Sequence, residues 1–297
     1  ITLEDKFHLG SCTKAFTATA AAVLVEEGTI TWQTTMGESL RALRPGAGWE
    51  SVRLEHLLTN TGGFPGSPPP EVWEEAWAAK GSARRQRESF LKEMLRDEPR
   101  FTPGDGFEYS NAGYAAAGVM LESAAGESWE DLIRTKIFEP LGMKSGGFGA
   151  PGSRARTPDQ PWGHDSEGNP VAPGPGADNP LAIAPAGAIH CSLPDWARFA
   201  LLHMERAGGR VLRREESFHK LHTPVRERYA MGWSVAERSW ADGPALTHMG
   251  SNTMFTAVLW IAPERGFAAM VAANISQEAA AAGCEEVVGE LVTRYLK

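Results

Sequence analysis

A serine and a lysine open a stretch of the sequence that is otherwise suited to burial. Ser11 and Lys14 stand at the head of LGSCTKAFTATAAAVLVEEG, residues 9–28, and no charged residue occurs from Ala15 to Val25. A helix beginning here carries the lysine into an apolar interior, where an unpaired ammonium is costly unless it gives up its proton. A lysine without that proton is a base.

The spacing of the two residues suggests what such a base would do. Positions i and i+3 share one face of a helix, so the amine of Lys14 can reach the hydroxyl of Ser11. The unpaired N–H groups of a helix N-terminus also favour developing negative charge. The pair therefore predicts an activated serine nucleophile. A capping role for Ser11 is the structural alternative, but it leaves Lys14 unexplained.

The same Ser-x-x-Lys spacing occurs twice more in the chain. Ser89 and Lys92 lie within RRQRESFLKEML, and Ser217 and Lys220 lie within RREESFHKLH. Both segments are charged and amphipathic, so a solvated helix face explains them without catalysis. The second segment also holds two histidines spaced for one helical face, and its charged context favours a solvated helix over a metal pair.

Two further segments carry polar residues next to turns or strands. FTPGDGFEYSNAGY places Tyr109 and Asn111 two residues apart after a Pro-Gly turn. THMGSNTMF places His248 and Gly250 at the expected entry to an apolar strand. A loop aromatic anchored by its hydroxyl is the structural alternative for Tyr109, and a hydrogen-bonded structural histidine is the alternative for His248.

Taken in order, SxxK, YxN and HxG resemble the serine hydrolase family that includes class C β-lactamases, DD-peptidases and related esterases. The segments VRLEHLLTNTGGFP, ESWEDLIRTKIFEPLGMKS, PAGAIHCSLPDWARFALL and MGW also resemble signatures of this family, in the expected order. The resemblance covers nearly the whole chain, which makes it far more specific than any one motif.

The resemblance implies a role for each catalytic residue. Ser11 would attack the carbonyl carbon, Lys14 would take or relay its proton, and Tyr109 would act as partner base and later protonate the leaving group. A phenol has an ordinary pKa near 10, so the choice between Lys14 and Tyr109 as the resting base stays open.

The resemblance also implies the groups that hold the substrate. Asn111 would orient the substrate and the catalytic lysine by hydrogen bonds. The backbone N–H groups of Ser11 and Ser251 would form the oxyanion hole. Gly250 would let the substrate lie along the strand.

His248 stands where β-lactamases and DD-peptidases of the family usually carry a lysine, the cation that meets a substrate carboxylate. A histidine is mostly neutral at pH 7 and is expected to donate a hydrogen bond instead, so the site should demand a carboxylate less strongly. The sequence therefore predicts a carboxylesterase-like serine hydrolase that acts on ester or amide bonds of small substrates. The alternatives are a class C-type β-lactamase or a DD-peptidase or D-aminopeptidase, and, from another class, a catalytically silent ligand-binding homologue.

The expected architecture is α+β. Helices are predicted at 11–27, 52–58, 71–97 and 111–126, after Ser192, and from about Gln277, with strands at 229–237, 253–263 and 266–275. The Gly- and Pro-rich segment 143–188 is predicted to be a loop that frames a site. The resemblance implies one β-lactamase/transpeptidase-like domain over 1–297, with a helical lobe at about 38–190 packed against an α/β lobe of 1–37 and 191–297.

The start of the chain raises a separate expectation. Family members usually place a β-hairpin before the SxxK helix, and the residues before Ser11 are too few for one. Three principal strands should remain, and the strand at 266–275 should have one open edge. We expect either an upstream segment in the natural protein or a homo-oligomer that buries this edge.

Composition excludes several other functions. The chain has 297 residues and a formal net charge of −8, which argues against nucleic acid or an anionic membrane as the main partner. No apolar stretch reaches the roughly 18 residues of a membrane span, and no signal peptide is recognisable. The three cysteines are scattered, so neither a disulfide framework nor a metal site is implied, and no cofactor is expected. The compartment stays open between periplasmic, secreted and cytoplasmic.

Overall fold

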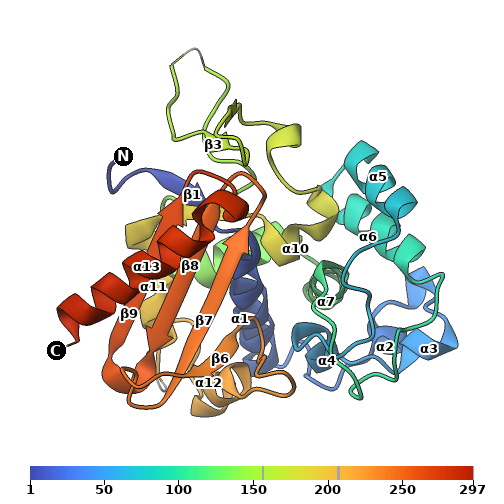
Figure 1. Cartoon of the computed structure of the whole chain (residues 1–297). Helices are drawn as coiled ribbons and strands as arrows, with labels where there is room; N and C mark the ends of the chain where they lie inside the picture. The colour runs from blue at the N-terminus through green and yellow to red at the C-terminus, as the bar shows by residue number, and fades with distance from the viewer. Residues whose placement is uncertain (156, 206–207, 297) are drawn as a thin grey trace.

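The computed structural model describes residues 1–155, 157–205 and 208–296. Its largest sheet has four antiparallel strands in the order β6-β7-β8-β9. These strands are β6 (Ser234–Glu237), β7 (Pro244–Ser251), β8 (Thr256–Ala262) and β9 (Phe267–Ala273). Helix α13 (Gln277–Tyr295) lies across one face of the sheet and α1 (Thr13–Glu26) lies behind the other (Figure 1).

The central strand β8 is buried along its whole length. Its side chains alternate between the two layers, as the pleat of a strand requires. Those at 257, 259 and 261 join the main core around α1, and those at 258, 260 and 262 pack under α13. The turn from β8 to β9 forms at Pro263–Arg265, followed by Gly266 with φ +63°, between the strands predicted at 253–263 and 266–275.

The expectation of three principal strands is wrong, because β7 forms a strand of its own. Its sequence PALTHMGS contains Pro, Gly and Ser, which are poor strand formers, so its strand signal is weak. Strand β9 lies at the sheet edge, and among the described residues β8 is its one strand partner, as expected.

Helix α1 is buried on all sides from Thr13 to Leu24, as expected for a helix without a polar face. Its threonine hydroxyls are satisfied inside the core. Thr17 Oγ1 donates to the Pro185 carbonyl at 2.7 Å, and Thr19 Oγ1 donates to the Ala15 carbonyl at 2.8 Å.

A group of helices lies to one side of the sheet (Figure 1). It comprises α2 (Met36–Ser39), α3 (Ala47–Glu50), α4 (Leu54–Leu58), α5 (Pro70–Ala78), α6 (Ala83–Met94) and α7 (Asn111–Ala125). Helix α7 ends at Gly126 with φ +75°, as the sequence predicts. The buried guanidinium of Arg87 on α6 pairs with Glu122 of α7 and with Glu130 of the next helix, α8 (Trp129–Ile133). This ion-paired cluster ties three helices together.

The remaining helices lie closer to the sheet. They are α8 (Trp129–Ile133) and α9 (Glu139–Leu141), joined by the π-helical turn η3 (Arg134–Phe138), then α11 (Leu193–Leu202) and α12 (Glu215–His222). Ser192 occupies the N-cap position of α11 as predicted, but its side chain does not cap the helix. The Ser192 hydroxyl lies 2.9 Å from Ser145 Oγ instead.

The 143–188 loop carries only short elements. They are β2 (Gly147–Phe148), β3 (Gly163–His164), β4 (Pro170–Val171), η4 (Pro175–Ala177), η5 (Leu181–Ile183) and α10 (Ala184–Gly187). Strand β5 (Ile189–Ser192) pairs with β2 and with β1 (Lys6–His8) in a small second sheet. This pairing holds both ends of the loop together and places the strand that follows the loop beside the segment that precedes Ser11.

None of the described helices is both long and apolar enough to cross a lipid bilayer. The boundaries of the two expected lobes stay a prediction.

Candidate active site

Ser11 lies in η1 (Gly10–Cys12), a single 3-10 turn that leads directly into α1. The backbone of Gly10 has φ +48°, and a Cβ at this position would collide with the backbone of Ser251. Only glycine suits this position, because it adopts a positive φ without strain and has no Cβ to prevent the approach of β7. The turn therefore places the Ser11 side chain between α1 and the end of β7.

The amine of Lys14 is fully buried and lies close to three oxygen atoms. Nζ is 3.1 Å from Ser11 Oγ, 2.7 Å from Asn111 Oδ1 and 3.0 Å from the carbonyl oxygen of Ala186. Burial lowers the pKa of Lys14 to about 7, because desolvation disfavours the charged amine. When the amine is neutral, its two N–H groups donate to Asn111 Oδ1 and to the Ala186 carbonyl. Its lone pair then accepts a hydrogen bond from the Ser11 hydroxyl.

Tyr109 precedes α7, and Asn111 is the first residue of that helix. The side chain of Ser110 caps the helix by accepting from the Gly113 N–H, which fixes the backbone between the two predicted residues. The Tyr109 ring lies beneath the Lys14 amine, 4.6 Å from Nζ to the ring centroid. The structure thus brings Tyr109 and Asn111 to Lys14, as the order of the motifs predicts.

Tyr109 keeps its proton in this environment. Burial raises the pKa of Tyr109 well above its ordinary value, the neighbouring Tyr229 raises it further, and Ser11 opposes the rise. The Tyr109 hydroxyl is buried, and no described residue meets it with hydrogen-bond geometry. The phenol is therefore a neutral donor, and Lys14 is the group that can accept a proton near pH 7.

Strand β7 brings the third motif against Ser11. A Cβ added to Gly250 would lie 2.7 Å from the Ser11 backbone nitrogen and 2.8 Å from that of Cys12. Such contacts are closer than real Cβ atoms make, so only glycine lets β7 approach η1 at this point. The approach brings the backbone of Ser251, the next residue on β7, against η1, since a Cβ on Gly10 would meet it.

His248 lies on β7 with only 7% of its side chain exposed. Its Nδ1 is 2.7 Å from the Met249 carbonyl oxygen. Because a carbonyl oxygen only accepts, Nδ1 carries the ring proton. Burial, with a smaller contribution from the charge of Lys14, lowers the pKa of His248 to about 4, so Nε2 has no proton near neutral pH.

This geometry corrects one expectation about His248. The sequence analysis expects its neutral ring to donate a hydrogen bond to the substrate, but the donor nitrogen is already used by Met249. Nε2 is buried without a hydrogen-bond partner among the described residues. Nε2 of His248 is therefore an acceptor and not a donor.

One cavity of about 510 Å³ is lined by the predicted residues Ser11, Tyr109, His248 and Ser251. Its other lining residues are Phe107, Glu227, Tyr229, Ser234, Met249 and Gln277. Sequence reasoning missed Tyr229, whose ring centroid is 6.0 Å from that of Tyr109, although it lies two residues before the MGW segment. It also missed the carbonyl of Ala186, because a backbone carbonyl leaves no signal in the residue type.

The other two Ser-x-x-Lys pairs lie outside this cavity. Ser89 and Lys92 are exposed on α6. On α12, Lys220 pairs with Glu55, and the Ser217 hydroxyl donates to a carboxylate of α1. Neither pair resembles the buried arrangement at Ser11.

The histidines of α12 differ from their prediction in part. His219 is exposed, as a solvated helix face requires. His222 is mostly buried, and its Nε2 lies 2.9 Å from Nδ1 of the buried His203. His222 therefore belongs to a hydrogen-bonded pair beneath the helix.

Comparison with known proteins identifies relatives of this chain. A family model described as Beta-lactamase matches residues 2–292. Penicillin-binding protein 4* of Bacillus subtilis is 35% identical over 141 residues, which cover 46% of this chain and 29% of that protein. Unguisins hydrolase ungD' of Aspergillus campestris is 24% identical over 301 residues, covering 95% of this chain and 55% of that protein. The chain thus spans about half the length, or less, of these curated relatives.

Solved structures share the fold over nearly the whole chain. The octameric penicillin-binding protein homologue from Pyrococcus abyssi superposes with a TM-score of 0.78 at 25% identity, covering 98% of this chain and 67% of that one. A D-stereospecific amidohydrolase from Streptomyces sp. gives a TM-score of 0.75 at 19% identity, covering 96% of this chain and 86% of that one. The fold is the β-lactamase/transpeptidase-like α+β fold. With the family model matching from residue 2 to residue 292, the chain belongs to the beta-lactamase family.

Proposed function

We propose that the protein is a serine hydrolase that forms an acyl-enzyme on Ser11 and then hydrolyses it. The observation that carries this proposal is the buried amine of Lys14, with a pKa of about 7, at 3.1 Å from the Ser11 hydroxyl. A base whose pKa lies near the working pH is half-deprotonated there and still accepts a proton well.

The proposed reaction has two halves, acylation of Ser11 and hydrolysis of the acyl-enzyme, and both use Ser11, Lys14 and Tyr109. Ser11 Oγ attacks the substrate carbonyl carbon as its proton passes to Lys14. The negative charge that develops on the carbonyl oxygen is met by the backbone N–H groups of Ser11 and Ser251. The Tyr109 phenol then protonates the leaving group and recovers a proton from Lys14. In the second half, a water molecule gives its proton to Lys14 and attacks the acyl carbonyl carbon. Ser11 then leaves with a proton from Tyr109, which recovers one from Lys14.

The proposed substrates are esters or amides of small molecules. The acceptor nitrogen of His248 repels a carboxylate, which suits neutral substrates better than penicillins or C-terminal D-amino acids. A solved structure of the same fold is named as a D-stereospecific amidohydrolase, which supports amides beside esters. A class C-type β-lactamase or DD-peptidase is the alternative within the family.

Covalent labelling tests the nucleophile. After reaction with a fluorophosphonate, peptide mass spectrometry should find one adduct, on Ser11. Ser11→Ala should abolish labelling and ester hydrolysis, whereas Ser89→Ala, the matched change on α6, should leave both intact. An adduct on any other serine would overturn the proposal.

Removal of the base supplies a second measurement. Lys14→Met should lower turnover of a p-nitrophenyl ester by on the order of a thousandfold or more, because nucleophile activation and acid–base help disappear together. Lys92→Met serves as the control. A folded Lys14→Met protein of near wild-type rate would show that the site is a silent binding groove or uses another base.

A further inference from the structure

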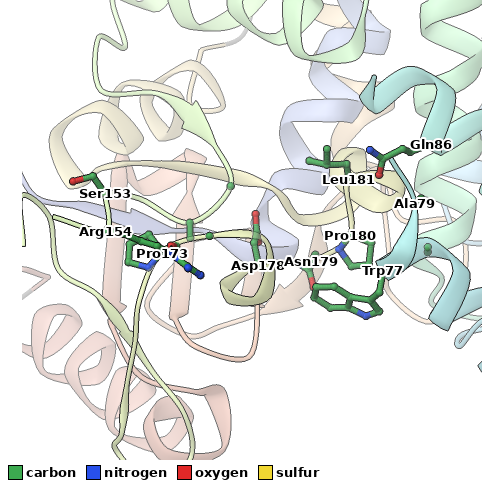
Figure 2. A pocket seen from close by; sticks show the side chains of 15 residues that line it. Trp77, Ala79, Gln86, Ser153, Arg154, Pro173, Asp178, Asn179, Pro180 and Leu181 are labelled. Atoms are coloured by element: carbon green, nitrogen blue, oxygen red, sulfur yellow. Dashed lines mark hydrogen bonds between the residues drawn. The ribbon is translucent and has the colours of Figure 1, made fainter. Parts of the chain in front are cut away.

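A second cavity, of about 530 Å³, lies between the C-terminal end of α5, helix α6 and the 143–188 loop. Figure 2 shows Asp178 near its centre, with Arg154 and Pro173 on one side and Asn179, Pro180 and Trp77 on the other. Most of the lining is apolar or small. Among the described lining residues, Asp178 supplies the carboxylate and Arg154 the guanidinium. The mechanism proposed for Ser11 uses none of them.

Asp178 is only 7% exposed, and its two oxygens have different surroundings. Oδ1 lies 2.8 Å from His8 Nε2 and 3.4 Å from Asn252 Nδ2. Oδ2 has no hydrogen-bond donor among the described residues, and it lies next to Gly149, where a Cβ would approach it to 3.3 Å. Oδ2 of Asp178 is thus available to a ligand on the side of the carboxylate that faces Gly149.

The charge of Asp178 is not cancelled by its histidine partner. Nδ1 of His8 accepts the Gly10 N–H at 3.0 Å and therefore carries no proton. The ring is neutral, with its proton on the Nε2 that faces Asp178. Among the described residues, no lysine or arginine forms an ion pair with Asp178, so a cationic ligand would supply the partner that this carboxylate lacks.

Apolar side chains project at the same cavity from two elements. Trp77 of α5 and Leu181 of η5 are each 43% exposed, unusual for large hydrophobic residues. Arg87 helps to hold η5 in place, since its Nη1 lies 3.3 Å from the Leu181 carbonyl oxygen. An exposed aromatic face beside a carboxylate is suited to an apolar body that carries a cation.

We propose that this cavity binds an organic ammonium, a primary amine on an apolar or aromatic body. The ammonium meets Asp178 Oδ2, and the body packs against Trp77 and Leu181. The volume falls within the range of about 300 to 1,000 Å³ that small-molecule sites occupy. The Arg154 side chain, whose Nε donates to the Pro173 carbonyl at 2.5 Å, lies at the exposed side of the cavity and disfavours a second cation there.

The cavity lies close to Ser11, because backbone segments that line it contact the turn that carries Ser11. Asn179 Nδ2 donates to the Gly187 carbonyl at 3.0 Å, and a Cβ on Gly187 would lie 3.6 Å from the Gly10 carbonyl carbon. His8 precedes Ser11 by three positions, which limits their Cα separation to roughly 11 Å. We further infer, on the basis of the proposed function, that the ammonium group lies in the acyl part of the substrates that Ser11 cleaves.

Calorimetry on the Ser11→Ala protein tests the cavity without requiring hydrolysis. The probes are 2-phenylethylamine, the neutral 2-phenylethanol and the anionic 3-phenylpropanoate. The amine should bind at least about tenfold more tightly than the alcohol, a ratio typical of one charge-assisted contact. Adding Asp178→Asn should remove this preference and Trp77→Ala should weaken binding of both neutral and cationic probes. Asp242→Asn, which removes a surface carboxylate between β6 and β7, should change neither.

Equal binding of amine and alcohol, preference for the anion, or an unchanged preference in Asp178→Asn would each overturn the ammonium site. A kinetic comparison then tests its link to Ser11. Methyl 6-aminohexanoate should have a higher kcat/KM than methyl hexanoate, and Asp178→Asn should erase that ratio. Equal kcat/KM values with activity still dependent on Ser11 would refute the acyl placement while leaving the proposed hydrolase intact. Absence of hydrolysis with amine binding retained would instead refute the hydrolase.

Discussion

At the residue scale, the two candidates for the resting base are separated by their surroundings. Burial acts on both, but it favours the neutral form of each, which is an amine for Lys14 and a protonated phenol for Tyr109. A neutral amine is a base, whereas a neutral phenol is an acid. We infer that Lys14 accepts the first proton and that Tyr109 donates to the leaving group.

The pH dependence of the reaction follows from this assignment. For a neutral ester, kcat/KM should rise as pH passes through about 7, the pKa of Lys14, and stay level to about pH 9, below the ordinary pKa of a phenol. Initial rates between pH 5 and 9 in buffers of constant ionic strength would measure it. His248, with its pKa of about 4, stays neutral over this range. A single rise near pH 10 would identify Tyr109 as the base instead.

Substrate preference also depends on single atoms. Because Nε2 of His248 accepts rather than donates, short-chain esters should have a higher kcat/KM than nitrocefin or penicillins. His248→Lys should reverse part of this difference, since a cation then faces the substrate carboxylate. The same assay on His219→Lys, an exposed site on α12, controls for added charge. A wild-type protein that prefers nitrocefin, or a His248→Lys protein without effect on carboxylated substrates, contradicts this interpretation.

At the element scale, the proposed catalysis requires the close approach of β7 to η1. Gly250→Ala should lower kcat by about a hundredfold or more, because the added Cβ forces the strand away from the backbone N–H groups proposed as the oxyanion hole. Gly289→Ala on α13 has open space around the new Cβ and should leave kcat unchanged. Steady-state kinetics with thermal unfolding curves measure both. A fully active Gly250→Ala enzyme would refute the close approach.

The outer edge of strand β9 is the second feature at the element scale, because its backbone can pair with another chain. Its sequence FAAMVAA has no charge and no proline, so it lacks the usual devices that keep edge strands from pairing. We predict a homo-oligomer that pairs through β9, with a mass in light scattering that exceeds that of one chain. Ala272→Lys should shift the protein toward the monomer, and Ala282→Lys on α13 should not. A monomeric wild-type mass at high concentration contradicts the prediction.

At the scale of the whole molecule, buried histidines connect stability to pH. His190, His222 and His248 each have a pKa lowered to about 4, chiefly by burial. The unfolded chain binds their protons near the ordinary value of about 6.5, so between these two pH values it holds more protons than the folded chain. The free energy of unfolding should therefore fall as pH drops from 6.5 to 4.

Urea unfolding at a series of pH values measures this fall. His222→Gln should flatten the dependence, because one of the histidines with a lowered pKa no longer titrates, even if the protein is less stable overall. His219→Gln, on the exposed face of the same helix, should keep the wild-type slope. A slope equal in all three proteins would show that His222 does not contribute.

Local sequence signals were sufficient wherever neighbouring residues decide the structure. The start of α1 after Ser11, the end of α7 at Gly126, the turn at Gly266 and the start of α13 were all predicted, because caps, glycines and turn residues act within a few positions. The order of the three motifs likewise indicated the family. β7 was missed, because its weak propensities are overridden by pairing with β6 and β8.

The decisive properties of the sites came from contacts between distant segments. Lys14 meets the carbonyl of Ala186, and His8 meets Asp178, across more than 160 positions in each case. Composition indicated a buried lysine, but the partners of its amine, the protonated nitrogen of His248 and the free oxygen of Asp178 depend on where other backbones lie. Residue types determine which protons can move. The fold decides which of them do, because burial and hydrogen-bond geometry set the free energy of each protonation state.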